Sequence, residues 1–288
     1  MIGRLRGYLR HRKRDLENTL TYVRLTLEGN KVEKLTDFKK SKHPVLLLYG
    51  FGATRRTFAI LEQRLRRDGF SVFSLNLGGF LDTFNTRCIE ELAEHVDEKI
   101  ERLFKRYKLK KISVIGHSKG GLIGRYYVKR LGGSKRVHTL ITLGTPHNGN
   151  PWALLGLATP LVLLSKSIRQ MFPMSPFIRA LKQGSFPKNV RFVSIYSRDD
   201  RVCFYKSAML DIPAKSPNLK NVEISGMNHI DLVIRKAAYN VIRRELRTGE
   251  HPRAQKMKTA KTTPTQRRIN KVANAPRGAQ VLPINRRS

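Results

Sequence analysis

Cysteine is scarce in this chain, which contains two among its 288 residues, Cys88 and Cys203. Two cysteines are too few for the set of disulfides that stabilises small secreted domains, and they lack the paired spacing of a structural zinc site. We therefore interpret both as ordinary thiols. The sequence indicates neither a metal ion nor an organic cofactor.

Long apolar runs are also missing. The apolar stretch at residues 151–164 is shorter than the roughly 20 residues that cross a bilayer, and Pro160 interrupts it. Residues 1–10 contain no apolar core of the kind that a secretory signal needs. We therefore expect no secretory signal and no membrane span, and a protein in the cytoplasm or peripherally bound at the inner face of the membrane.

Acidic residues are few, with 21 Asp and Glu against 57 Lys and Arg and a formal net charge of +36. The excess is partly concentrated at the two ends, which we separate as a basic N-terminal segment, residues 1–43, and a disordered basic tail, residues 249–288. Such ends attract phospholipid headgroups or nucleic acid. No nucleic-acid motif with stacking aromatic residues accompanies the charge, so we favour an anionic membrane, with residues 1–10 as a short basic amphipathic helix.

Between the two ends, short apolar runs alternate with helix-like segments. Runs typical of buried strands lie at residues 44–48, 70–75, 112–115, 139–143, 191–196 and 221–224. Residues 89–107 carry apolar side chains at the i, i+3, i+4 spacing of a helix. The alternation predicts an α/β fold with a mostly parallel sheet and helices on both faces, so active residues should lie at the carboxyl ends of the strands.

The motif Gly116-His117-Ser118-Lys119-Gly120 stands between one of these strands and a helix-like run that begins at Gly121. A serine at so sharp a turn adopts a strained backbone, and the flanking glycines keep Cβ atoms out of the space where strand and helix cross. The turn directs the hydroxyl, together with the first N–H groups of the helix, toward a substrate. We therefore predict that Ser118 is a nucleophile.

A nucleophilic serine needs an orienting acid and a base, which follow it in the chain in that order. The strand-like run at 191–196 leads into a polar loop that contains Asp199 and Asp200, and the run at 221–224 leads into the loop of His229. His229 is the predicted base, and either aspartate can supply the acid.

Three neighbouring polar residues have simpler interpretations. We interpret His117 as a hydrogen-bonded core histidine and His147 as a brace for the loop after a strand, because His229 already supplies the imidazole. Asp231 is interpreted as an acid that the dipole of the closing helix favours at its N-terminus.

Four segments in this order make the chain resemble the α/β-hydrolase superfamily and, within it, the bacterial lipases and esterases. They are Leu48-Tyr49-Gly50-Phe51-Gly52, Gly116-His117-Ser118-Lys119-Gly120, Leu143-Gly144-Thr145-Pro146-His147-Asn148-Gly149, and the loops of Asp200 and His229. The third segment is the most typical of lipases. The resemblance favours Asp200 over Asp199, because a valine follows Asp200 two residues later, as in the family pattern.

The resemblance also implies an oxyanion hole. Its donors would be the backbone N–H groups of Phe51 and Lys119, each worth roughly 3 to 4 kcal/mol of transition-state stabilisation. We expect the Lys119 side chain itself to be exposed or to face the cleft. Tyr49 stands where lipases usually have a histidine.

Residues 44–248 would then form one α/β-hydrolase domain with a helical cap inserted at about residues 150–186, which would cover an apolar acyl-binding cleft or form an inert buried hairpin. We expect a lipase-like or esterase-like serine carboxylester hydrolase that cleaves lipid-type esters through an acyl-enzyme. Acyl transfer or thioester hydrolysis on the same triad is the alternative, because the intermediate is shared. A basic membrane-binding or nucleic-acid-binding scaffold with an inactive hydrolase fold is the non-enzyme alternative, against which the ordered Ser, Asp and His argue.

Overall fold

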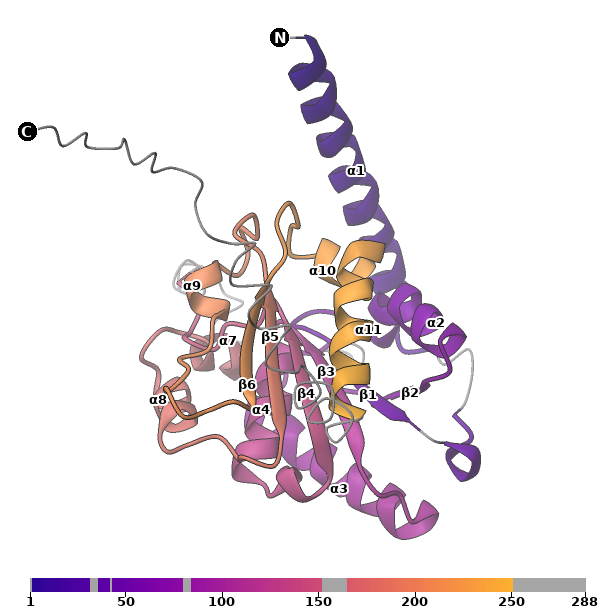
Figure 1. Ribbon diagram of the computed structural model, residues 1–288, viewed down its shortest axis with the longest axis vertical. Coiled ribbons are helices and arrows are strands. Elements are labelled where there is room, and N and C mark those ends of the chain that lie inside the picture. Colours follow the sequence, from indigo (N-terminus) through magenta and orange to yellow (C-terminus); the bar gives the residue numbers. More distant parts are fainter. Residues whose placement is uncertain (1, 32–35, 42, 80–83, 152–164, 251–288) are drawn as a thin grey trace, which may run out of the picture. The chain divides into compact units, whose positions relative to one another are not determined.

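The computed structural model describes residues 2–31, 36–41, 43–79, 84–151 and 165–250 (Figure 1). Its centre is a six-stranded sheet in the order β2-β1-β3-β4-β5-β6, in which every neighbouring pair is parallel. The strands are β1 (Pro44–Leu48), β2 (Ser71–Ser74), β3 (Ile112–His117), β4 (Val137–Leu143), β5 (Arg191–Tyr196) and β6 (Leu219–Glu223). The predicted parallel α/β fold is confirmed.

Helices cover both faces of this sheet, as predicted. Successive strand residues point to opposite faces. On one face Leu140 of β4 meets α4 (Lys119–Arg130), where a Cβ at Gly124 would lie 3.1 Å from the Leu140 side chain. On the other face Thr139 meets α11 (Lys236–Glu250), where a Cβ at Gly249 would collide with the Thr139 hydroxyl. Because helices cover both faces, β1 and β3 are buried along their whole length.

The remaining helices extend these two layers. Helix α3 (Ile89–Tyr107) packs against α4, and α10 (Asp231–Ile234) contacts α2 (Ala59–Arg67). Short elements complete the described part: η1 (Phe38–Lys40), η2 (Arg55–Phe58), η3 (Gly133–Lys135), α7 (Lys166–Gln170), α8 (Pro176–Lys182) and α9 (Tyr205–Ala208).

The strand order determines where a site can form. The chain passes from β1 outward to β2 and then returns past β1 to β3, so the loops that leave β1 and β3 diverge from each other. Ligands of open α/β sheets bind in the crevice at such a switch point. The first two sequence motifs follow β1 and β3, and therefore border this crevice.

The N-terminal segment that sequence analysis set apart is in large part helix α1 (Ile2–Leu27), which contacts η2 and α10 (Figure 1). Leu25 is buried, Asn18 donates a hydrogen bond to Asp231 at 2.6 Å, and Thr54 donates one to the Thr26 carbonyl at 3.1 Å. The second half of α1 is thus part of the folded unit that extends to Gly249.

Two sequence predictions fall largely outside the described residues. Residues 152–164 of the predicted cap and 251–288 of the predicted tail are not described, so the cap and the disorder of the tail stay predictions. Where the chain is described, no helix combines the length and apolar character needed to cross a membrane.

Candidate active site

Ser118 links β3 to α4 with φ of 52° and ψ of −125°. A positive φ costs a non-glycine residue on the order of 1–3 kcal/mol and persists only where the surroundings enforce it. Here the Ser118 N–H donates to the Leu143 carbonyl at 2.9 Å, and the Ser118 carbonyl accepts from the Gly121 N–H at 3.0 Å. The strained turn thus has the strand-to-helix context that the motif predicted.

The glycines of the motif allow α4 to cross the sheet closely. A Cβ at Gly116 would lie 2.5 Å from the Gly121 Cα, and a Cβ at Gly120 would overlap the Leu48 carbonyl. The predicted reason for these glycines is therefore confirmed. Gly121 is crowded in the same way by Thr145, which belongs to the lipase-like segment after β4.

Asp200 and His229 form a buried hydrogen-bonded pair. The loop after β5 carries Asp200 and the loop after β6 carries His229, and 2.7 Å separates Asp200 Oδ2 from His229 Nδ1. Asp200 Oδ1 accepts from the N–H groups of Val202 and Cys203 at 2.9 and 2.8 Å, which fixes the carboxylate. An Nδ1–H donor leaves Nε2 of His229 as the acceptor that a general base needs.

Gly144, which sequence analysis did not single out, makes room for this pair. It follows β4 with φ of 51°, and a Cβ there would lie 2.8 Å from Asp200 Oδ2 and 3.0 Å from His229 Nδ1. In the sequence, its position between a strand and Thr145-Pro146 indicates a turn. Only the fold shows which side chains lie against it.

Asp199, the competing acid, has a different contact. Its carboxylate accepts the Gly226 N–H at 2.7 Å, so it braces the loop that carries His229. Among the described residues, Asp199 makes no contact with the imidazole of His229.

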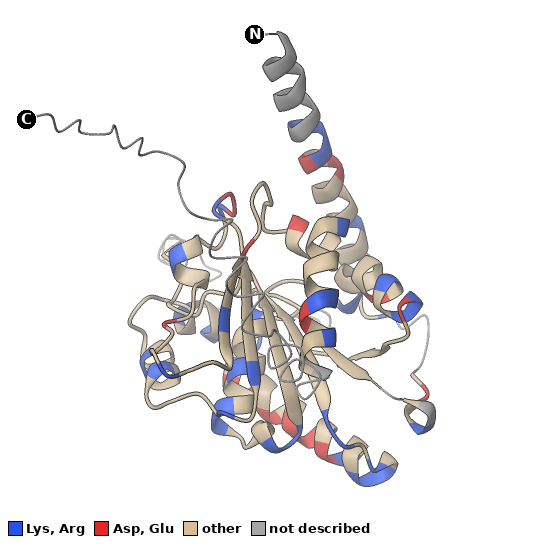
Figure 2. Ribbon diagram, in the orientation of Figure 1, with Lys and Arg blue, Asp and Glu red and all other residues tan. Residues whose placement is uncertain are grey.

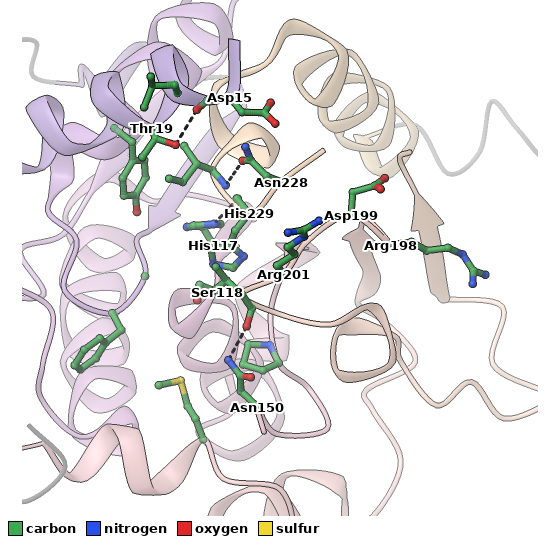
Figure 3. A pocket seen from close by; sticks show the side chains of 18 of the residues that line it. Asp15, Thr19, His117, Ser118, Asn150, Arg198, Asp199, Arg201, Asn228 and His229 are labelled. Carbon is green, nitrogen blue, oxygen red and sulfur yellow. Dashed lines mark hydrogen bonds between the residues drawn. The ribbon is translucent and has the colours of Figure 1, made fainter. Parts of the chain in front are cut away.

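Ser118, His229 and Phe51 line one cavity of about 1190 Å³ (Figure 3). Gly50 lies so close to Ser118 that a Cβ at Gly50 would be 3.1 Å from the Ser118 Cβ. The loop after β1 therefore passes directly beside Ser118. The Lys119 N–H, at the first position of α4, is one of the helix N–H groups that lack an intrahelical acceptor.

The Lys119 side chain is fully buried, so the expectation that it is exposed or cleft-facing is wrong. Its Nζ donates to Asn85 Oδ1 at 2.9 Å, to the Arg87 carbonyl at 2.5 Å and to the Asn85 carbonyl at 3.4 Å. These acceptors compensate for the loss of water, which is why a lysine can lie there. Burial lowers the pKa of Lys119 to about 7, partly offset by Cys88 and Glu91.

Tyr49, in the position where lipases usually have histidine, also has a bracing role. Its buried hydroxyl accepts the Leu77 N–H at 2.7 Å and donates to Asn30 Oδ1 at 3.2 Å. Asn30 Oδ1 accepts the Arg55 N–H as well, at 3.0 Å. The substitution therefore ties the loop after β1 to the segment that follows α1.

The other polar residues near the motifs have structural contacts. His117 Nε2 lies 3.1 Å from the His229 carbonyl, and His147 Nε2 lies 2.9 Å from the Thr142 hydroxyl. Asp231 begins α10, a short helix that ends before the closing helix α11, rather than the closing helix itself; it is buried and accepts from Asn18 and from the Asn228 N–H.

Helix α1 forms one wall of the cavity, which sequence analysis did not predict. One face of α1, with residues at i, i+3, i+4, i+7 and i+10, lines the cavity with Ser118: Arg12, Asp15, Leu16, Thr19 and Tyr22. The spacing signals a helix face, but no pattern in the sequence shows what that face contacts. In the described part of the chain, no group of three or more His, Cys, Asp or Glu side chains could hold a metal ion.

Comparisons with known proteins agree with this fold. A family model described as the alpha/beta hydrolase fold matches residues 43–162. A triacylglycerol lipase of Pseudarthrobacter phenanthrenivorans is 28% identical over 124 residues, which cover 40% of this chain and 37% of that lipase. The aligned part of the chain thus spans little more than a third of this relative's length.

Two solved structures have similar folds. Mature Bacillus licheniformis lipase BlEst2 aligns with a TM-score of 0.59 at 15% identity, over 76% of this chain and 96% of that one. Aspergillus fumigatus lipase B aligns with a TM-score of 0.59 at 19% identity, over 73% of this chain and 53% of that one. The chain therefore has the α/β-hydrolase fold, and its predicted resemblance to bacterial lipases and esterases is confirmed.

Burial of His117 and His147 predicts acid sensitivity. Burial lowers the pKa of both well below 6.5, helped by the neighbouring His229 and Arg125 respectively. Below about pH 6.5 the unfolded chain therefore binds more protons than the folded chain. The free energy of unfolding should fall as the pH falls, by up to about 1.4 kcal/mol per pH unit for each histidine.

Urea unfolding between pH 7 and pH 5 measures this slope. His147→Gln keeps a hydrogen-bond partner for the Thr142 hydroxyl but removes one titrating imidazole. It should therefore reduce the pH dependence of the free energy of unfolding by about the contribution of one histidine. An unchanged slope would show that His147 titrates alike in the folded and unfolded states.

Proposed function

We propose that the protein is a serine carboxylester hydrolase that cleaves lipid-type esters through an acyl-enzyme. The observation that carries the proposal is the Asp200–His229 hydrogen bond, with His229 lining the same cavity as the strained Ser118. Ser118 attacks the ester carbonyl, while His229 takes the proton and returns it to the leaving alcohol. Asp200 holds the imidazole tautomer and stabilises its positive charge.

In this mechanism the N–H groups of Phe51 and Lys119 stabilise the oxyanion of the tetrahedral intermediate. Water then attacks the acyl-enzyme, with His229 again as the base. An acyl acceptor other than water, or a thioester in place of an ester, would use the same intermediate, so acyl transfer and thioester hydrolysis are the alternative activities.

The cavity walls support an ester with an apolar acyl group. Ile168 and Met171, in and beside α7, line the cavity together with Leu16 of α1 and Val202 of the Asp200 loop. Residues 165–182 belong to the proposed cap, which would cover this apolar surface in water and open at a lipid surface.

Ser118→Ala tests the nucleophile. We expect loss of p-nitrophenyl ester hydrolysis and of labelling by a fluorophosphonate, with an unchanged thermal unfolding midpoint, because only a hydroxyl at a turn is removed. Gel fluorescence of the labelled protein and assays across acyl lengths measure this. Folded wild-type protein that neither labels nor hydrolyses would favour the inactive scaffold.

The two aspartates can be separated by paired kinetics. Asp200→Asn should lower kcat by roughly 10⁴, because an amide favours the wrong imidazole tautomer. Asp199→Asn should change kcat by less than about threefold, because an amide oxygen still accepts the Gly226 N–H. The reverse order would identify Asp199 as the orienting acid.

An exposed apolar line on α1 supports binding to an anionic lipid surface. Leu16, Leu20, Val23 and Leu27 are 49–75% exposed and recur at steps of four, three and four residues, so they share one side of the helix. Helix α1 also carries exposed basic residues, namely Arg12, Lys13, Arg14 and Arg24. Six of the 21 acidic residues lie on another helix, α3 (Figure 2).

Leu16 belongs to both the apolar line and the cavity wall, so a bound lipid surface would lie at the entrance for its esters. A second copy of the chain fits this line less well. Four side chains bury far less than the roughly 800 Å² per partner of a stable interface, and two chains of charge +36 repel each other.

Co-sedimentation with phosphatidylglycerol vesicles tests this surface, using Ser118→Ala protein so that no lipid is consumed. Leu20→Gln, Val23→Gln and Leu27→Gln together should weaken binding about tenfold, because three inserted apolar side chains are lost. Ile212→Gln, an exposed control on another segment, should not.

Removal of residues 250–288 should weaken binding mainly at low ionic strength, where basic residues are least screened. Equal vesicle binding by every variant would exclude both the α1 line and the tail as membrane contacts. Nucleic acid or another acidic partner would then be the better explanation for the basic tail, and binding of duplex DNA tests the first of these.

A further inference from the structure

The buried side-chain nitrogen of Lys119 makes specific hydrogen bonds, which a side chain that only fills space would not need. Its three N–H donors match three acceptors: Asn85 Oδ1, the Asn85 carbonyl and the Arg87 carbonyl. A buried ammonium is costly unless it is fully hydrogen-bonded, and an apolar side chain would fill the same volume without that cost. The specific hydrogen bonds are therefore the feature to explain.

Asn85 is the link between Lys119 and the loop after β1. Asn85 Nδ2 donates to the Tyr49 carbonyl at 2.8 Å, and the Asn85 carbonyl accepts the Gly52 N–H at 3.1 Å. The Asn85 N–H donates to the Ala53 carbonyl at 3.2 Å. These three bonds hold the loop on both sides of Phe51.

Lys119 also lies next to Phe51 itself. Its Nζ is 5.7 Å from the centre of the Phe51 ring, which is within the range of a cation–π contact. Lys119 directly follows the serine turn, so its side chain connects this turn to the segment that holds Phe51.

We propose that Lys119 is a positioning residue that fixes the two oxyanion donors relative to each other. Its backbone N–H is one donor, and its side chain, through Asn85, holds the loop that carries the other, the Phe51 N–H. This inference rests on the proposed hydrolase function and adds a role for a side chain that the triad does not use.

The positioning role predicts a loss in kcat rather than in substrate binding. Oxyanion donors act on the charge that develops in the transition state, so displacement of Phe51 leaves the ground state nearly unaffected. Lys119→Met should lower kcat by roughly 10²-fold, the scale of one lost donor, and change KM by less than about threefold.

A trifluoromethyl ketone with the acyl chain of the substrate reports on the oxyanion directly. Its carbonyl carbon accepts the Ser118 oxygen, His229 takes the proton, and the adduct carries an oxyanion. The affinity of Lys119→Met for this ketone should fall by the same factor as kcat, whereas its affinity for the matching methyl ketone should not change.

Lys111→Met is the matched control. Lys111 is partly buried and donates to the Ser134 carbonyl at 3.0 Å, at the amino ends of β3 and β4 and therefore away from the loop of Phe51. Its removal should leave kcat and the ketone affinity unchanged. Thermal unfolding of both variants measures the structural cost of losing such a lysine.

Asn85→Ala provides a second test should Lys119→Met fail to fold. It should reproduce the fall in kcat and in ketone affinity, and the double variant should be no worse than the poorer single variant, because both act through one linkage. Additive effects of the two substitutions would overturn the proposed linkage.

The proposal fails if folded Lys119→Met or folded Asn85→Ala keeps the wild-type kcat and ketone affinity, or if Lys111→Met loses activity equally. Fluorophosphonate labelling of the wild type separates this failure from that of the hydrolase function. If the wild type is labelled and active but substitution of Lys119 has no effect, only the positioning role is refuted. If the wild type is not labelled, the hydrolase function itself is refuted.

Discussion

The close crossing of α4 over the sheet is the constraint on which the rest of the site depends. Gly116 and Gly120 have no space for a Cβ, and Gly124 meets the side chains of Leu140 and Val114. Because the helix begins so near the strands, Ser118 is forced to a positive φ and the first N–H groups of α4 lie at the carboxyl end of β3. The same approach carries the Lys119 side chain into the interior, where the Asn85 segment surrounds it.

The sequence predicted the parts of this arrangement that are local. Strand runs, the glycines around Ser118 and the loops of Asp200 and His229 are patterns of a few neighbouring residues, and the structure has a hydrogen bond between the last two side chains. The catalytic roles of these residues remain predictions, but their proximity follows from strand order. Residues at the carboxyl ends of adjacent parallel strands meet at one edge of a sheet.

What the sequence could not predict depends on contacts between distant segments. Asn18 and Asp231 are 213 residues apart, and neither the basic composition of the N-terminal segment nor its helical spacing indicates that α1 borders the cavity. The prediction that the Lys119 side chain is exposed was wrong for the same reason, because lysine side chains are usually exposed to water. The burial of Lys119 is tolerable because the Asn85 side-chain oxygen and the backbone carbonyls of residues 85 and 87, over 30 positions away in the chain, accept its hydrogen bonds.

Two buried side chains near Ser118, Asp200 and Lys119, each make three hydrogen bonds. Asp200 contacts three N–H donors beside the imidazole, and Lys119 contacts three oxygen acceptors beside the loop of Phe51.

In the proposed reaction, positive charge develops on His229, next to the buried Asp200 carboxylate, and negative charge develops on the ester oxygen, next to the N–H groups of Phe51 and Lys119. Groups that are already oriented need no rearrangement as the transition state forms, and they act more strongly where water is excluded. Burial of the Asp200 carboxylate and of the Lys119 amine would thus serve the charge separation of the proposed reaction, because an apolar residue at either position would hold neither the imidazole nor the loop of Phe51.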